Sequence, residues 1–214
     1  MIKCVIFDLD GTLVDTIEGI AVSMNRVLQD RLLPTHTTET YKRFVGNGLK
    51  QLVYKALPAE YRDEKTVVCG YEALLTYYRS YFNQGLSIYQ GIGELLDHLV
   101  AHDIALAVNT NKHQEMTDWI MGNCFAKSPF VKIIGAESGF EKKPSPQAAH
   151  SILDSVGVSP EQCLYIGDSE VDYETAMGAG IKCLLVTWGF RTLEELMSLH
   201  NDMIEVPSEV LKYL

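Results

Sequence analysis

The sequence predicts an α/β protein with a Rossmann-like parallel sheet and helices on both of its faces. The first observation is a series of short apolar runs without alternating polar residues, a pattern typical of strands buried on both faces. The second is that helical patterns separate most of these runs, as in open α/β sheets. The third is a long stretch, 16–84, that has helical patterns and no strand pattern. This stretch predicts a small all-helical domain inserted after the first strand.

The apolar runs give the expected strands in chain order. They are CVIFDL at 4–9, IALAVNT at 104–110, VKIIGAE at 131–137, CLYIGDS at 163–169 and CLLVTW at 183–188.

Helices are expected between the later strands. Apolar residues recur at helical spacing from Ile92 to Val100, and a further helix is expected from Pro146 to Val156, closed by Gly157. Ser159 to Gln162 and Thr192 to Glu195 both match the capping-box pattern, in which a side chain at each end of a helical turn accepts a backbone N–H.

The inserted stretch contains amphipathic patterns over 17–28, 49–57 and 67–82. We therefore expect a core domain made of 1–15 and 85–214 and a helical domain of 16–84. An insertion at the end of the first strand is expected over the carboxyl edge of the sheet, where ligands bind in this fold class.

Composition excludes several classes of function. The formal net charge is −10, which argues against nucleic-acid binding and against docking on an anionic membrane. No signal-peptide pattern and no apolar stretch long enough to span a membrane is found, so a cytoplasmic protein is expected. The five cysteines form no C-x-x-C pair and are expected to be reduced, buried thiols.

Polar residues follow four of the expected strands at their carboxyl ends. They are Asp8 and Asp10, then Thr110 and Asn111, then Lys143, and finally Asp168 and Asp172. Each is explained singly as a turn residue, a helix cap or a surface lysine. Structural roles do not explain the whole set, because neighbouring carboxylates repel one another unless a cation lies among them. The carboxyl ends of parallel strands meet at one edge, so these residues predict a single site.

The ordered motifs D-x-D-G-T-L, T-N-K, K-P and G-D-S-x-x-D resemble those of the haloacid dehalogenase superfamily, and the resemblance covers essentially the whole chain. It implies that 16–84 is a helical cap domain. It also implies that Asp8 is a nucleophile forming an aspartyl-phosphate and Asp10 the general acid and base. Thr110, Asn111 and Lys143 would hold the phosphoryl oxygens, together with backbone N–H groups near Gly11 and Thr12. Mg²⁺ would bind at Asp8, Asp10 and Asp168, with Asp172 at or behind the metal.

The dehalogenases that give the superfamily its name lack the second aspartate, so the resemblance implies that Asp10 favours phosphoryl transfer over halide displacement. The helical insertion and the motif around Lys143 resemble those of phosphoglycolate phosphatases, which implies a small phosphorylated substrate. Asn47, in the sequence Gly46-Asn47-Gly48, and Lys50 are candidate substrate-binding residues, although the glycines are equally explained as a helix end and turn.

Several alternatives remain open at this point. They are a phosphatase for pyrophosphate, a sugar phosphate or a nucleotide; a phosphomutase; and a receiver-like phospho-acceptor or an inactive regulatory module. A monomer or a weak homodimer is expected.

Overall fold

The computed structural model describes residues 1–199 and 202–214, and these residues form two compact units. The first unit contains Met1–Val14 and Ile88–Leu214, and the second contains Asp15–Ser87. The boundaries expected from the sequence differ from these by one to three residues. Each unit is described here separately.

The first unit contains a six-stranded sheet in the order β5-β4-β1-β6-β7-β8, in which every pairing is parallel. The expected α/β fold with a parallel sheet is therefore confirmed. The strands are β1 (Cys4–Phe7), β4 (Ala105–His113), β5 (Phe130–Ala136), β6 (Cys163–Gly167), β7 (Lys182–Val186) and β8 (Met203–Ile204).

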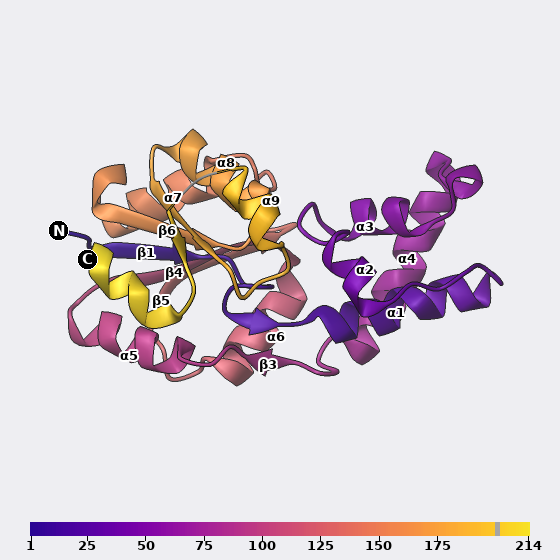
Figure 1. The fold of residues 1–214 in the computed structure, drawn as a ribbon, viewed down its shortest axis with the longest axis horizontal. Coiled ribbons are helices and arrows are strands. Elements are labelled where there is room, and N and C mark those ends of the chain that lie inside the picture. The colour runs from indigo at the N-terminus through magenta and orange to yellow at the C-terminus, as the bar shows by residue number, and fades with distance from the viewer. Residues whose placement is uncertain (200–201) are drawn as a thin grey trace. The chain divides into compact units, whose positions relative to one another are not determined.

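Helices cover both faces of this sheet (Figure 1). On one face, α7 (Gln147–Val156) and α8 (Glu170–Ala179) pack with α9 (Leu193–Met197) over side chains of β1, β6 and β7. On the other lie α5 (Ile92–Ala101), α6 (Gln114–Cys124) and the 3₁₀ helix η3 (Pro207–Tyr213). Central residues such as Ile6 and Phe7 are fully buried, because both faces of the sheet are covered.

The local signals in the sequence account for several helix ends. Ser159 forms the expected capping box with Gln162 before η2 (Pro160–Gln162), and Thr192 forms the second with Glu195 before α9. Gly157 ends α7 with a φ of 74°, a left-handed conformation that glycine adopts without steric cost. These expectations are confirmed.

The second unit is helical. It contains α1 (Ile17–Asp30), α2 (Thr38–Lys42), α3 (Leu49–Ala56), η1 (Ala59–Tyr61) and α4 (Glu64–Tyr81). Helix α4 packs against α1 and α3, and the fully buried Tyr41, Leu74 and Tyr78 contribute to its interior. Two short strands, β2 (Val14–Asp15) and β3 (Ser87–Ile88), pair where the chain passes between the units. The sequence did not predict β2, β3 or β8.

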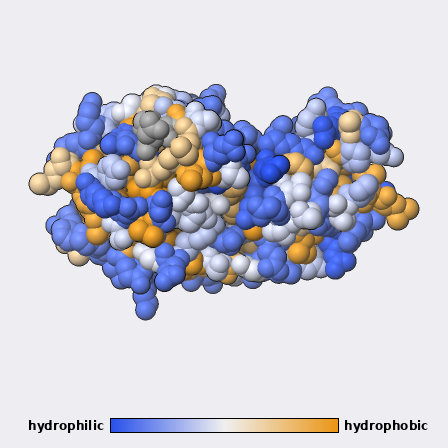
Figure 2. All heavy atoms as spheres, viewed as in Figure 1, coloured by the Kyte–Doolittle hydropathy of each residue, from blue (hydrophilic) through white to orange (hydrophobic). Residues whose placement is uncertain are grey.

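The surface of the molecule is mixed in polarity. Hydrophilic residues cover much of the visible face, with hydrophobic residues in small groups between them (Figure 2). Among the described residues, no helix is both long enough and apolar enough to span a membrane. All five cysteines are free thiols, as expected, but Cys69 is exposed and Cys124 half-buried. The expectation of burial is therefore wrong for these two, which lie on helices α4 and α6, whereas the three buried cysteines lie in the doubly covered sheet.

Candidate active site

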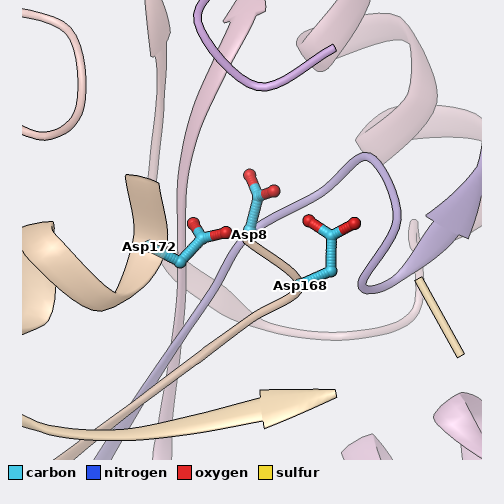
Figure 3. A group of neighbouring side chains, drawn as sticks. All are labelled: Asp8, Asp168 and Asp172. Carbon is cyan, nitrogen blue, oxygen red and sulfur yellow. The ribbon is translucent and has the colours of Figure 1, made fainter. Parts of the chain in front are cut away.

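Three carboxylates meet at the carboxyl ends of two neighbouring strands. Asp8 follows β1, Asp168 follows β6, and Asp172 lies in the first turn of α8. One oxygen of each lies within 4.8 Å of the others, and all three residues are buried. Asp8 lies between the other two, and its carboxyl group points the same way as that of Asp168 (Figure 3). The parallel register of β1 with β6, which pairs Phe7 with Ile166, brings these residues together.

Lys143 supplies a positive charge inside this cluster. Its Nζ lies 2.8 Å from Asp8 Oδ1 and 2.6 Å from Asp172 Oδ1, and the lysine side chain is 3% exposed. The other oxygen of Asp172 accepts hydrogen bonds from the backbone N–H and the hydroxyl of Ser169, at 3.1 and 2.7 Å. Both oxygens of Asp172 are therefore engaged, and this carboxylate anchors the lysine beside Asp8.

The charge balance of the cluster appears in the pKa values of its members. Burial raises the pKa of Asp8 to about 7; Lys143 opposes this shift, while the nearby Asp172 and Asp10 add to it. Burial, then Asp172 and Asp8, raise the pKa of Asp168 well above its usual range. Burial alone would lower the pKa of Lys143, but Asp172 and Asp8 raise it well above the ordinary value. With all three carboxylates ionised, one buried lysine would leave excess negative charge, so the donor set suits a hard cation.

The Asp168 side chain is held in place by the loop after β7. The backbone N–H of Phe190 donates to Asp168 Oδ2 at 2.7 Å. A Cβ atom added to Gly11 would lie 2.3 Å from Asp168 Oδ2, and one added to Gly189 would lie 2.3 Å from Asp168 Cβ. Only glycine therefore fits at these two positions, where backbone passes directly against the carboxylate.

Asp10 lies in the turn after β1 and has a different partner. Lys112 Nζ donates to Asp10 Oδ1 at 3.0 Å and to Oδ2 at 3.2 Å. The lysine side chain is 2% exposed and the aspartate side chain 11% exposed. Lys112 follows Thr110-Asn111 directly, but no role is predicted for it from the sequence. Its position could have predicted this contact, because a lysine buried at the carboxyl end of a central strand needs an acidic partner.

Thr110 and Asn111 also lie at the end of β4, and both are buried. The Asn111 side chain bonds the Lys143 backbone in both directions: Nδ2 donates to the carbonyl at 3.0 Å, and Oδ1 accepts from the N–H at 2.9 Å. Asn111 therefore fixes the segment that carries Lys143. The Thr110 hydroxyl accepts from the Lys112 N–H at 3.2 Å, which leaves its proton available.

The turn at Gly11 and Thr12 uses its own backbone donors. The Gly11 N–H donates to the Val14 carbonyl at 2.9 Å and the Thr12 N–H to the Leu9 carbonyl at 3.3 Å. The Thr12 hydroxyl is buried and has no hydrogen-bond partner in the described part of the chain. Both backbone N–H groups are thus engaged within the chain, whereas the role of the hydroxyl toward a ligand stays a prediction.

The remaining two predicted residues belong to the helical unit. Asn47 lies between Gly46 and Gly48, whose φ angles are 121° and 83°, and Lys50 lies in the first turn of α3. Their role toward a substrate stays a prediction.

The chain is similar to known proteins over most of its length. Residues 5–186 match the haloacid dehalogenase-like hydrolase family. A Rhodospirillum rubrum protein named phosphoglycolate phosphatase is 32% identical over 89% of this chain and 81% of its own length. One of the same name from Aliivibrio fischeri is 30% identical over 100% of this chain and 95% of its own length. A crystal structure of a predicted phosphoglycolate phosphatase from Haemophilus somnus covers 99% of this chain and 97% of its own, with TM-score 0.90 and 27% identity. The chain therefore belongs to the haloacid dehalogenase-like hydrolases.

Proposed function

We propose that this protein is a Mg²⁺-dependent phosphatase that hydrolyses a small phosphate monoester through an aspartyl-phosphate on Asp8. The observation that carries the proposal is the buried Asp8 carboxylate, held 2.8 Å from Lys143 and beside Asp168. With Lys143 beside it and Mg²⁺ bound, this carboxylate can approach an anionic phosphoryl group, because the two cations would offset the repulsion between them. The family assignment supports the same chemistry.

The reaction has two displacements at phosphorus. An Asp8 oxygen forms a bond to phosphorus while the bond to the ester oxygen breaks, and Asp10 gives the departing alkoxide a proton. Asp10, now ionised, then takes a proton from water as the water oxygen attacks the phosphorus of the acyl phosphate. That step breaks the bond between phosphorus and Asp8 and releases inorganic phosphate, which restores both carboxyl groups.

The neighbouring residues stabilise the charge on the phosphoryl oxygens. Lys143 offers a buried cation, and the hydroxyl groups of Thr110 and Thr12 offer hydrogen-bond donors. Asn111 keeps Lys143 in place through the paired backbone hydrogen bonds described above. Asp172 acts indirectly by holding Lys143, because its two oxygens already accept hydrogen bonds from Lys143 and Ser169.

The side chains of Asp8 and Asp168 and the carbonyl oxygen of Asp10 would hold the Mg²⁺ ion. When bound, the ion supplies positive charge that draws the phosphate toward Asp8 and offsets the negative charge of the transition state. These residues suit a Mg²⁺ ion because the cluster contains three buried carboxylates, whose combined negative charge Lys143 alone does not neutralise. In this proposal Asp172 supports the site from the second layer, rather than acting as a direct ligand.

Phosphoglycolate is the proposed substrate, supported by the names of the relatives that match nearly the whole chain. In this proposal the helical unit acts as the family's cap domain. Asn47 and Lys50 would select the leaving group from that unit, where a lysine and turn N–H groups suit a small anion.

A panel of phosphate esters assayed with Mg²⁺ and with a chelator tests this function. The panel contains phosphoglycolate, pyrophosphate, a hexose phosphate, a nucleoside monophosphate and p-nitrophenyl phosphate. We expect phosphoglycolate to have the highest kcat/KM, chelator to abolish turnover, and Mg²⁺ to restore it. Full activity in chelator would contradict the metal assignment. Equal activity on all the esters would contradict the substrate assignment while leaving the phosphatase assignment in place.

A further inference from the structure

Each of the two aspartates of the D-x-D motif has its own buried lysine partner. Lys143 contacts Asp8 and Asp172, whereas Lys112 contacts both carboxylate oxygens of Asp10, at 3.0 and 3.2 Å. Lys112 comes from β4, and Lys143 from the segment between β5 and α7. The reaction proposed above uses Lys143 and leaves Lys112 without a role.

The backbone of Lys112 is fixed on several sides. It lies within β4, and its N–H donates to the Thr110 hydroxyl at 3.2 Å. A Cβ atom on Gly135 of β5 would lie 2.8 Å from the Lys112 carbonyl oxygen, so the neighbouring strand passes directly against it. With 2% of its side chain exposed, Lys112 has little freedom to move away from Asp10. A residue on a rigid strand can hold a reacting group more accurately than one on a loop.

Asp10 needs such support, because it lies in a turn outside any strand or helix and an aspartate side chain can rotate about its Cα–Cβ bond. A general acid must lie within hydrogen-bond reach of the ester oxygen, and small displacements of a reacting group are costly in rate. A cation that contacts both oxygens restricts this rotation.

We propose that Lys112 is a positioning residue that holds the Asp10 carboxyl group in its orientation for proton transfer. The inference rests on the proposed function, since it acts through the acid–base role of Asp10. This positioning role differs from a purely electrostatic one. If Lys112 only offset negative charge in the site, its loss would slow all esters equally, including those whose leaving group needs no protonation. It also differs from a contact between Lys112 and the substrate, which would act on KM for anionic leaving groups.

The test is a double-mutant cycle of Lys112→Met, Asp10→Asn and the double variant, assayed on phosphoglycolate and on p-nitrophenyl phosphate. An alkyl ester needs protonation of its leaving group, and a nitrophenyl ester needs little. We expect Lys112→Met to lower kcat on phosphoglycolate by about 10- to 100-fold. The loss on p-nitrophenyl phosphate should be smaller. In the Asp10→Asn background the same substitution should cost almost nothing further, because its target is gone.

Lys127→Met is the matched control, because Lys127 is exposed and lies in the connection between α6 and β5. It should behave as the wild type. Circular dichroism and thermal unfolding establish that each variant is folded. If Lys112→Met does not fold, Lys112→Gln replaces it, because that side chain is shorter, polar and uncharged. A crystal structure of the variant should show the Asp10 carboxyl group turned from its wild-type orientation.

Several outcomes would overturn the inference alone, provided that the wild type hydrolyses both esters and Asp8→Asn hydrolyses neither. They are an unchanged or higher kcat on phosphoglycolate, equal losses on the two esters, an effect confined to KM, and full additivity with Asp10→Asn. Turnover by Asp8→Asn at the wild-type rate would instead contradict the proposed function, and this inference with it.

Discussion

Each carboxylate in this site has its own set of partners, and among the described residues only Asp10 is paired one-to-one with a lysine. Asp8 and Asp172 share Lys143, Asp10 has Lys112, and Asp168 receives the Phe190 N–H. Removal of one partner from a buried pair leaves an uncompensated charge, which is more costly than loss of an exposed pair. We therefore expect substitutions here to affect both activity and stability, and the two effects must be measured separately.

The division of labour between Asp8 and Asp10 gives the first prediction. Asp8→Asn should abolish turnover on every ester, because an amide is a poor nucleophile. Asp10→Asn should slow turnover on an alkyl phosphate by roughly 10²–10⁴-fold, with a smaller loss on p-nitrophenyl phosphate. Steady-state kinetics on both esters measures this difference. Equal losses by Asp10→Asn on the two esters would argue against Asp10 as the acid.

The raised pKa of Asp8 gives the second prediction, for stability in chelator. A carboxyl group with a pKa of 3.8 before folding and about 7 afterwards favours the folded state below the lower value. This contribution is lost as the pH rises through the higher value. The melting temperature of the metal-free protein should therefore fall from about pH 5 to about pH 8. Thermal unfolding by circular dichroism measures the change.

Asp8→Asn is the control for this pH dependence. Its amide is close in size to the carboxyl group but carries no charge, so its melting temperature should fall less over the same range. Mg²⁺ should raise the melting temperature of the wild type most at the higher pH, where Asp8 and Asp168 are more often ionised. The same fall in wild type and Asp8→Asn would show that Asp8 does not cause it.

At the scale of elements, the turn after β1 and the loop after β7 shape the site through close backbone contact. Gly11 has a φ of 87°, and a methyl group there would collide with Asp168. A methyl group on Gly189 would collide with the same side chain and with the Gly11 carbonyl oxygen. These two glycines allow the loops to enclose a side chain that would otherwise move.

Gly11→Ala gives the third prediction. The positive φ costs an alanine about 1–2 kcal/mol, and displacement of Asp168 adds to that loss. We expect a lower melting temperature and at least about a 100-fold loss of kcat. Gly122→Ala is the control, because Gly122 lies in α6 and, apart from its own helix backbone, no described atom lies within 4 Å of the added methyl group. That variant should be as stable as the wild type or slightly more stable. A fully active Gly11→Ala enzyme would contradict the account of the turn.

Local signals in the sequence predict the longer elements well and the shortest ones poorly. The capping boxes at Ser159 and Thr192 and the Gly157 helix end were readable, because each depends on residues within one turn. The strands β2, β3 and β8 have two residues each and so carry no periodic pattern. The extension of β4 to His113 was missed, because its last residues are polar.

The candidate site shows the same limit. The motifs predict that Asp8, Lys143 and Asp168 lie together, because strand ends meet at one edge of a parallel sheet, and the structure places them in contact or within 4.8 Å. The partners of each side chain were not predictable. The contact between Lys112 and Asp10 and the bonds from Asn111 to the Lys143 backbone join positions far apart in sequence, so only the folded chain reveals them.

At the scale of the whole molecule, the chain leaves the core after β2 and returns at β3, with the helical unit in between. The candidate catalytic and metal-binding residues all belong to the first unit, and the helical unit carries only the proposed specificity residues Asn47 and Lys50. An inserted domain of this kind can change freely without altering the reacting groups. This division gives the fourth prediction.

Asn47→Ala and Lys50→Ala should raise KM for phosphoglycolate or change the order of preference among esters. Turnover of p-nitrophenyl phosphate should stay close to that of the wild type, because the reacting groups are intact. Lys65→Ala is the control, since Lys65 is exposed on α4 in the same helical unit. Loss of activity on every ester by a folded Asn47 or Lys50 variant would show that the helical unit takes part in catalysis itself.

The most direct test of the central claim is to find the phosphoryl group on Asp8. Enzyme mixed with phosphoglycolate and Mg²⁺ is quenched in acid during turnover, digested and analysed by mass spectrometry. Asp10→Asn is included, because slower hydrolysis of the intermediate should allow it to accumulate. We predict one added phosphoryl group on the peptide that contains Asp8, and none in Asp8→Asn. Phosphate release by an enzyme that carries the group on another residue, or by Asp8→Asn at the wild-type rate, would contradict the nucleophilic role of Asp8.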